Sequence, residues 1–440
     1  MKNENILNKK LTILTSLTIL SGCSSIHIPE NKFANPKEIN QRYSITDENS
    51  FFYEYLEDDI SIFLAFSGGG ARAAALSYGV LEELKNSKIK NEKTLEDKIK
   101  VISSVSGGSF TSAYYGLYKE DFYLNFKNKV LYKDISDELL YRFFNPFNMI
   151  FSDYKRADIA KQYYKDNIFG NATFKDLNKK NSPFIIINAS DISTGERFSF
   201  TQEYFDLICS DINDYPIYNA VTASAAVPVL FEPIVIDNYK ECKQLEFFND
   251  NKNLSKEAEE TFHSAEAYLD KDKNKYIHLI DGGITDNLGL LAFEDLMNFG
   301  EIKKNQKKSY KNKNILIIVV DASTSPDLKI GESFEEPNIT QTINVVTDIQ
   351  LHRYNQTTKK RFKELLKDWE KSFNDKNQNV NTYFIDINFQ NTFNKEKEFF
   401  FNQIPTDMSL EKETIDLIIE EAKKQLRSNK EYNKLLRKLQ

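Results

Sequence analysis

The stretch IKVISSVSGG, residues 99–108, decides the fold. Its first seven residues are mostly β-branched or small, which is typical of a short buried strand. Gly107 then opens a pattern that favours a helix. A strand that turns sharply into a helix through small residues presents the side chain at the turn on top of the sheet. The stretch therefore predicts a strand, a tight turn with Ser106 at its centre, and a helix.

The same alternation continues on both sides of this unit. Ser61–Phe66 is a continuous apolar run, as in a strand buried on both faces, and Ala71–Leu84 has the apolar stripe of a helix. Further buried-strand patterns lie at Phe184–Asn188, Pro228–Ile236, Tyr276–Ile280, Ile315–Val320 and Tyr383–Ile387. Strands that alternate with helices predict an α/β fold whose central sheet is mostly parallel.

The composition suits one large folded domain or two ordinary ones. Of the 440 residues, 40% are hydrophobic and 28% are charged, which is enough apolar material for a sizeable core. The net charge of -7 gives no basic footprint, so a nucleic-acid partner is not expected. The three cysteines form no CxxC pair, and the sequence therefore signals no metal site. Cys209 and Cys242 either pair in an oxidising compartment or remain two buried thiols.

Three segments outside the strand–helix rhythm have their own character. Residues 237–275 are rich in Lys, Asn, Asp and Glu and predict a charged surface insertion. Lys303–Lys313 predicts a short basic loop, which is expected to be solvated like the insertion. Ser409–Leu436 predicts a C-terminal helical extension with Ser409 as its N-cap.

The N-terminus is expected to lie outside the fold. Lysines precede the apolar run Leu11–Leu20, which is too short to span a bilayer comfortably, and the run ends in Leu-Ser-Gly-Cys23. This order resembles the bacterial lipoprotein signal, which implies a signal peptide over 1–22 and a lipid on Cys23. Residues 23–57 then form a polar tether, and 58–440 the folded domain. The resemblance implies the cell envelope, and the outer membrane in a Gram-negative cell. The alternatives are a plain secretory signal or an uncleaved anchor.

A glycine-rich loop, Ser67-Gly-Gly-Gly-Ala-Arg-Ala73, connects the first strand to the first helix. Consecutive glycines let the backbone N–H groups of Gly68, Gly69 and Gly70 approach a reacting oxygen, and the helix N-terminus adds positive potential. Arg72 either assists there or holds the loop by hydrogen bonds. The glycine spacing also fits a dinucleotide-binding loop. That fold needs an acidic residue at the end of the next strand, which instead ends in the serine turn. No Gly-Lys-Ser/Thr follows, so a P-loop is not indicated either.

The third candidate segment is Asp281-Gly282-Gly283, directly after the apolar strand Tyr276–Ile280. A carboxylate at the carboxyl end of a strand is expected at the same sheet edge as Ser106. The alternative is an ordinary Asp-Gly turn.

In this order, the glycine loop with its arginine, the serine turn and Asp-Gly-Gly resemble the patatin-like phospholipase family. The resemblance continues in Ala223-Ser-Ala-Ala-Val-Pro228, with Phe231 and Pro233 following, and in the segment 188–201. It covers about residues 60–295 and implies a three-layer α/β/α fold. Ser104 in place of the usual glycine of the turn, and Ala73 in place of the glycine after Arg72, depart from the family pattern.

The chain's four histidines decide between a catalytic dyad and a triad. His27 lies in the tether, His263 in the charged insertion and His352 in a helical stretch. His278 stands three residues before Asp281, and this odd offset along a strand places the two side chains on opposite faces. A Ser106–Asp281 dyad is therefore favoured, in which Asp281 accepts the proton of the serine hydroxyl. Burial is expected to raise the pKa of Asp281.

The resemblance implies a lipid acyl hydrolase of the phospholipase A or lysophospholipase type, with membrane lipids as substrates. It implies an acyl-Ser106 intermediate, an oxyanion hole formed by Gly68–Gly70 with Arg72, and no metal or organic cofactor. The alternatives are an acyltransferase that uses the same dyad, or a lipid-anchored binding protein without turnover. The aromatic segment Tyr141–Phe151 is expected either to pack as a satellite core or to form a lip facing the membrane.

Overall fold

The computed structural model describes residues 30–44, 59–144, 155–179, 182–241, 264–295, 313–325, 339–375 and 379–440, with single residues 331, 334 and 336. The predicted signal peptide and Cys23 lie outside the described residues, as do residues 242–263 and 296–312. Within the described part, no helix is long and apolar enough to cross a bilayer.

Strands and helices alternate along most of the chain, as the sequence predicts. The strands are β1 (Ile60–Phe66), β2 (Ile99–Val105), β3 (Phe184–Asp191), β4 (Arg197–Ser199), β5 (Ile234–Asp237), β6 (Tyr276–Asp281), β7 (Lys313–Asp321) and β8 (Val380–Asn388). The helices are α2 (Gly70–Asn86), α3 (Gly107–Tyr118), α4 (Phe122–Phe126), α5 (Ile135–Phe143), α7 (Arg156–Tyr164), α8 (Phe174–Leu177), α9 (Gln202–Leu207), α10 (Ile217–Ser224), α12 (Gly283–Asp286), α14 (Ile339–Asn374), α15 (Lys395–Asn402), α16 (Lys412–Ser428) and α17 (Lys430–Leu439).

All of these strands belong to one sheet with the order β5-β6-β3-β2-β1-β7-β8, and β4 pairs with β3. The strands β3, β2, β1, β7 and β8 run parallel. In contrast, β4 and β6 run antiparallel to β3, and β5 runs antiparallel to β6. The sheet is therefore mixed and mostly parallel, which confirms the predicted fold class.

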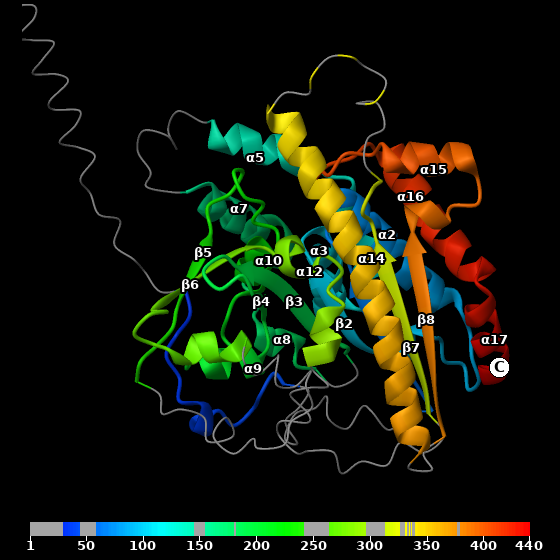
Figure 1. The fold of residues 1–440 in the computed structure, drawn as a ribbon, viewed down its shortest axis with the longest axis horizontal. Coiled ribbons are helices and arrows are strands. Elements are labelled where there is room, and N and C mark those ends of the chain that lie inside the picture. The colour runs from blue at the N-terminus through cyan, green and yellow to red at the C-terminus, as the bar shows by residue number, and fades with distance from the viewer. Residues whose placement is uncertain are drawn as a thin grey trace, which may run out of the picture.

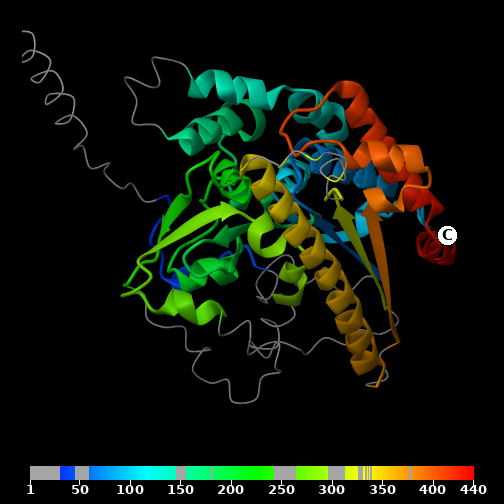
Figure 2. The ribbon, with the colours of Figure 1, turned by 45° about the horizontal axis from the view of Figure 1, so that its top comes forward.

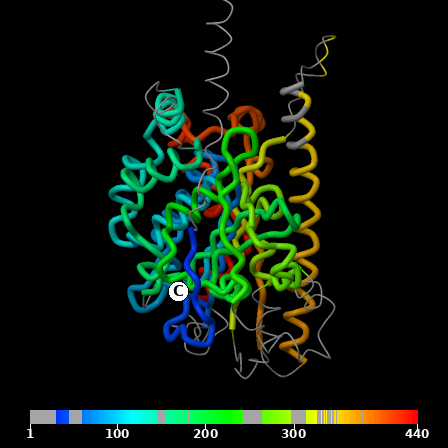
Figure 3. Tube along the Cα trace, turned by 90° about the vertical axis from the view of Figure 1, so that its left-hand side faces the viewer, coloured from blue at the N-terminus to red at the C-terminus, as the bar shows by residue number. Residues whose placement is uncertain are grey.

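Helices cover both faces of the sheet, so the domain has three layers. The long helix α14 crosses one face in front of β7 and β8 (Figure 1), and it runs along one side of the molecule in the side view of Figure 3. Helices α2 and α3 pack on the other face, where α2 also contacts α16. Figure 2 shows the teal helices α5 and α7 together at one end of the molecule.

The core lies along the central strands. Every residue of β2, β3 and β7 is buried, and so are all but one in β1. This burial explains why β1, β3 and β7 contain continuous apolar runs rather than alternating patterns, because helices cover both of their faces. The same burial makes the edge of the sheet, where these strands end, a rigid base for a site.

The N-terminal segment 30–44 packs against the domain, although the sequence predicted a tether over residues 23–57. The Tyr43 hydroxyl is fully buried, donates to the Ile185 carbonyl and accepts from the Ile185 N–H, both at 2.9 Å. Asn31 donates to the Ser210 hydroxyl at 2.7 Å. These buried polar contacts hold the segment, and composition alone does not show them.

Two further predictions need correction. The strand expected over Pro228–Ile236 begins only at Ile234, because a turn that includes Val229 at φ 74° precedes it. The C-terminal helix is divided at Asn429 into α16 and α17, and α16 begins after Glu411. Ser409 does not cap it, since its hydroxyl instead accepts from the Ser136 N–H at the start of α5.

The last part of the predicted charged insertion is folded. Residues 264–269 at the end of the insertion are helical, and Ala265 and Tyr268 there are buried in the core, so this part is not a solvated loop.

Cys209 is disulfide-bonded, with its partner outside the described residues. Two buried free thiols are therefore not the arrangement of this chain.

Candidate active site

Ser106 stands at the sharp turn between β2 and α3. Its backbone has φ 49° and ψ -120°, a conformation that residues other than glycine rarely adopt. The residue is 8% exposed. Strained backbone at a serine that joins a strand to a helix is the geometry of a nucleophile elbow. The structure therefore places Ser106 where the sequence predicts it.

Small residues are required around this turn. A Cβ on Gly107 would lie 2.0 Å from the Gly70 carbonyl oxygen, and one on Gly108 would lie 2.7 Å from the Ser67 carbonyl oxygen. Ser104, which departs from the family pattern, is fully buried, and its hydroxyl bonds with Ser112 at 2.6 Å and with the Ile186 carbonyl at 3.1 Å. A small side chain with its hydroxyl satisfied fits the space that glycine usually fills.

Ser224 holds the backbone of the elbow from the end of α10. Its hydroxyl accepts from the Ser106 N–H at 2.8 Å and donates to the Asn188 carbonyl at 2.6 Å. It also lies 2.9 Å from the Ser109 hydroxyl. The Asn188 amide in turn donates to the Ser104 carbonyl at 3.0 Å. This network joins α10, β3 and the elbow, and fixes the Ser106 backbone in its strained conformation.

Asp281 reaches the same point from the opposite direction. Val105 lies beside Asn188 in β3, and the next residue of β3, Ala189, lies beside Asp281 of the antiparallel strand β6. The Asp281 carboxylate accepts hydrogen bonds from the Ser106 side chain and from the Gly283 N–H, the latter at 2.7 Å. A serine hydroxyl and a buried carboxylate in hydrogen bond are the two partners of a proton-transfer dyad.

The electrostatic setting suits a general base. Burial raises the pKa of Asp281 to about 6, while the hydrogen bonds from Gly283 and Ser106 lower it in part. A carboxylate with a pKa in this range is a stronger base than one in water, and it is still ionised near neutral pH. The direction of this shift agrees with the prediction from the sequence.

The glycine loop faces the elbow and offers backbone donors. The Gly68 N–H donates to the Asn287 carbonyl at 3.0 Å, and the Ala71 N–H donates to the Asp407 carbonyl at 2.7 Å. Between them, the N–H groups of Gly69 and Gly70 donate to no acceptor in the described part of the chain. Gly69 at φ 132° and Gly70 at φ 60° have backbone conformations that favour glycine. The predicted oxyanion hole thus narrows to Gly69 and Gly70, since the N–H of Gly68 is occupied.

Arg72 is buried and holds the loop against two distant segments. Its guanidinium donates to the Ala322 carbonyl at 2.8 Å and to the Ile404 carbonyl. These bonds match the second of the two roles that the sequence leaves open for Arg72, that of holding the loop. A direct part in oxyanion binding stays a prediction.

An apolar cavity of about 250 Å³ opens beside Ser106. Its walls come from α3, from residues 130–131, from α5, from the segment 225–231 after α10, and from residues 406–408. The apolar lining residues are Ala71, Ala74, Phe110, Val130, Leu131, Ile135, Leu139, Leu140, Phe143, Ala225, Val227, Leu230, Phe231 and Met408. A channel of this chemistry next to a nucleophile accommodates an acyl chain rather than a polar substrate.

The rim of the cavity exposes further apolar side chains. Leu140, Tyr141 and Phe144 at the end of α5 are 47%, 73% and 71% exposed, and Leu230 across the cavity is 57% exposed. In the predicted aromatic segment, Phe143 instead packs edge-on against Phe231. Phe147 and Phe151 of that segment lie outside the described residues. In the described part of this aromatic segment, Phe143 thus belongs to the cavity wall, whereas Tyr141 and Phe144 form an exposed apolar surface.

The histidines take no part in the described geometry of the dyad. The His278 ring lies 3.5 Å from the Ser193 hydroxyl, away from Asp281, and His352 lies in the long helix α14. His27 and His263 lie outside the described residues. In the described part of the chain, no group of three or more His, Cys, Asp or Glu side chains is arranged to hold a metal ion.

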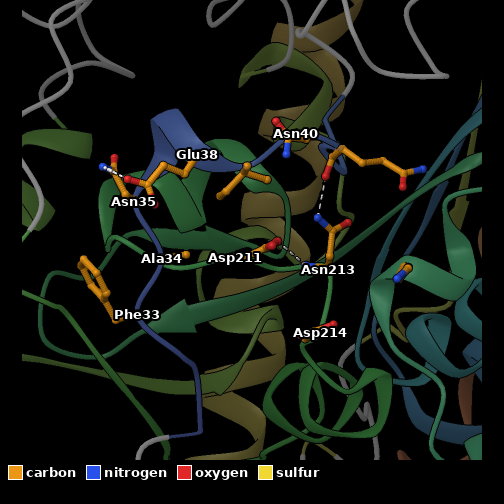
Figure 4. Close-up of a pocket in the computed structure, with 11 residues that line it drawn as sticks. Phe33, Ala34, Asn35, Glu38, Asn40, Asp211, Asn213 and Asp214 are labelled. Atoms are coloured by element: carbon orange, nitrogen blue, oxygen red, sulfur yellow. Dashed lines mark hydrogen bonds between the residues drawn. The ribbon is translucent and has the colours of Figure 1, made fainter.

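A second cavity, of about 530 Å³, lies where the N-terminal segment crosses the domain (Figure 4). Its side chains bond to their own neighbours: Asn213 donates to the Gln41 carbonyl at 2.6 Å, and Asn35 to Glu38 at 3.1 Å. Its lining contains no serine, cysteine or histidine. This cavity is polar and has no nucleophile in its lining, whereas the smaller cavity at Ser106 is lined by the serine of the elbow.

The fold and this geometry are those of a serine hydrolase of the α/β class. The chain matches the patatin-like phospholipase family over residues 64–293, just over half of its length, and it belongs to that family. Membership implies lipid acyl hydrolase activity in general.

Among solved structures, the chain is similar to human GIVD cytosolic phospholipase A2, with 12% identity and a TM-score of 0.35. The match covers 63% of this chain, which spans about half of that protein (48%). No curated protein matches the sequence.

Sequence reasoning missed several residues that build the site. Asn287 and Asp407 support the glycine loop, and Asn188 and Ser224, which hold the elbow, were noted only as parts of longer segments. Asp407 lies far from the motifs along the chain, so no local signal points to it. For Ser224, the best signal in the sequence was the run of small residues before Pro228. Small residues allow the end of a helix to pack closely against the elbow.

Proposed function

We propose that this protein is a phospholipase A or lysophospholipase that cleaves fatty acyl esters through an acyl-Ser106 intermediate. The observation that carries the proposal is the hydrogen bond between Ser106 and the buried Asp281, beside an apolar cavity that opens at Ser106. Family membership supports the reaction class, and the apolar lining supports a fatty acyl chain as the part of the substrate that enters.

The first half-reaction forms an ester on the enzyme. The Ser106 oxygen attacks the ester carbonyl while its proton passes to Asp281. The carbonyl oxygen becomes an oxyanion, which the N–H groups of Gly69 and Gly70 stabilise; removal of one such donor typically costs about 3 kcal/mol. The intermediate then collapses, the bond to the leaving alcohol breaks, and that alcohol takes the proton from Asp281.

The second half-reaction releases the fatty acid. Asp281 takes a proton from water, whose oxygen attacks the acyl carbon, and the same N–H groups stabilise the second oxyanion. Collapse breaks the bond to Ser106, which regains its proton from Asp281. If an alcohol replaces water in this step, the product is a new ester, so an acyltransferase differs only in the acceptor.

The proposed setting is a bacterial cell envelope. The sequence Leu20-Ser-Gly-Cys23 supports a lipid on Cys23, and the disulfide at Cys209 supports an oxidising compartment. An anchor of this kind would hold the cavity close to membrane lipids.

The test is mass spectrometry of lipids incubated with purified protein. We expect wild type to release free fatty acid from phosphatidylcholine or lysophosphatidylcholine, and Ser106→Ala and Asp281→Ala to release none above background. A fluorophosphonate probe should label wild type but not Ser106→Ala. Products that contain a new ester when glycerol is added would identify acyl transfer instead. Equal fatty-acid release by wild type and Ser106→Ala would contradict the proposal.

A further inference from the structure

One charged residue lies at the cavity beside Ser106. Among the described residues that line this cavity, Asp407 alone has an ionisable side chain, and it is exposed. The backbone of Asp407 touches the glycine loop, since its carbonyl accepts from the Ala71 N–H, and a Cβ on Gly70 would lie 2.0 Å from that oxygen. Gly70 in turn touches Gly107 of the elbow. Asp407 and the nucleophile Ser106 therefore lie on either side of the glycine loop.

The Asp407 carboxylate is held in one orientation. Its Oδ1 accepts from the Ser136 hydroxyl of α5 and from the Ser409 N–H, the latter at 3.1 Å. Among the described residues, Oδ2 accepts no hydrogen bond, and no lysine or arginine pairs with the group. An oriented carboxylate with a free oxygen and no paired cation adds negative potential at this point of the cavity.

The placement of this charge matters because of the shape of a phospholipid. When the scissile ester lies at Ser106 and its acyl chain fills the apolar cavity, the polar head has to remain at the mouth, where Asp407, Thr406 and Ser136 form the polar part of the lining. A head group with a net negative charge meets repulsion there. A head group that also contains an ammonium cation gains an attractive partner.

We propose that Asp407 determines head-group specificity, by favouring lipids whose head contains a cationic ammonium group over anionic lipids. This inference rests on the proposed function and narrows its substrate class to zwitterionic glycerophospholipids of the choline or ethanolamine type. Asp407 lies outside the family-matched residues 64–293, so the selection belongs to a part of the chain that the family match does not cover.

The test compares two short-chain phospholipids that differ only in the head group, dihexanoyl phosphatidylcholine and dihexanoyl phosphatidylglycerol, both used as monomers. Monomeric substrates remove the effect of membrane surface charge on binding. For wild type we expect kcat/KM to be about tenfold higher for the choline lipid, mainly through KM. In Asp407→Asn, which keeps the shape and the acceptor for Ser136, the ratio should approach unity. In Asp407→Lys the preference should reverse.

Asp137→Asn is the matched control, since Asp137 is an exposed acid on the same helix as Ser136 but does not line the cavity. It should keep the wild-type ratio. A wild-type ratio near unity, or an unchanged ratio in both Asp407 variants, would overturn the inference while leaving the proposed function intact. If wild type hydrolyses neither lipid, nor any other acyl lipid, the proposed function fails and the inference falls with it.

Discussion

Ser106 and Asp281 meet at the ends of two strands that approach one point from opposite directions. Ser106 follows the last residue of the parallel strand β2, and Asp281 is the last residue of β6, which runs antiparallel to β3. The two groups are hydrogen-bonded, and both are more than nine-tenths buried. Because both residues are held at the ends of strands that pair in one sheet, the dyad is preorganised before substrate binds.

The pH dependence of activity should follow the ionisation of Asp281. Burial raises the pKa of this group to about 6, and only the ionised form can accept the serine proton. We therefore expect kcat/KM for a soluble ester to be constant above about pH 7 and to fall about tenfold per pH unit well below the pKa. A pH–rate profile measured with a neutral substrate checks this. A profile that stays flat down to about pH 4 would exclude Asp281 as the base.

Replacement of Asp281 by Asn should stabilise the protein above the pKa of the carboxyl group. The pKa is raised from 3.8 to about 6 on folding, so the folded state favours the protonated form. The wild-type protein loses stability as pH rises from about 4 to about 6, by at most about 3 kcal/mol. Asp281→Asn does not titrate, so it should have the higher Tm at about pH 8 and lose this advantage near pH 4. Thermal unfolding at both pH values measures the difference, and an equal Tm gap at both would contradict it.

A methyl group on Gly70 should inactivate the enzyme. Its Cβ would lie 2.0 Å from the Asp407 carbonyl oxygen, and its φ of 60° already disfavours a side chain. We expect Gly70→Ala to displace the oxyanion loop and to lower kcat by about 100-fold or more. Gly170→Ala is the control, because Gly170 has φ 61° and no atom within 4 Å of the added Cβ. Steady-state kinetics of the two variants distinguish the clash with the Asp407 carbonyl from backbone strain. An equal loss of kcat in both variants would contradict the prediction.

Removal of the Ser224 hydroxyl should slow the reaction without changing the dyad itself. Ser224→Ala leaves the buried Ser106 N–H without its acceptor, at a cost of about 1–3 kcal/mol, and loosens the elbow. We expect kcat to fall about 10-fold to 100-fold while KM changes little. Ser112 lies on α3, and its hydroxyl bonds with that of Ser104 in β2. The kcat of Ser112→Ala should remain within about threefold of wild type. A kcat equal to wild type in Ser224→Ala would show that the elbow holds without this bond.

The exposed apolar side chains at the rim should matter only for aggregated lipid. Tyr141 and Phe144 are 73% and 71% exposed, so serine at both positions should cost little stability. If they form a surface that contacts lipid, the double variant should lose about tenfold or more on vesicles and keep its activity on a monomeric short-chain ester. Parallel assays with both substrates provide the check. Equal loss on both substrates would assign the residues to the fold of the cavity.

The sequence predicted those parts of the molecule whose causes are local. β2 spans Ile99–Val105 as expected, and the serine turn and the Asp-Gly-Gly strand end lie where their motifs place them. Buried central strands have continuous apolar runs, and sharp turns need small residues, so both leave a mark over a few neighbouring residues.

Features that depend on distant pairing could not be predicted. The direction of β6 follows from its pairing with β3, and apolar residues are equally compatible with either direction. Gly68 was expected to be an oxyanion donor, but its N–H bonds to Asn287. Segment 30–44 packs through Tyr43 and Asn31, whose polar partners lie more than 140 residues away. No pattern within these segments encodes such partners.

The position of β1 has a practical consequence for anyone who expresses this protein. The family-matched region begins inside β1, at residue 64, and ends at residue 293, before β7 begins at Lys313. In the sheet, β1 lies between β2 and β7. A fragment cut at these limits would turn a central strand into an open edge with a row of unpaired amide groups, which is a template for aggregation. Soluble protein therefore requires the C-terminal strands, which lie outside the family-matched region.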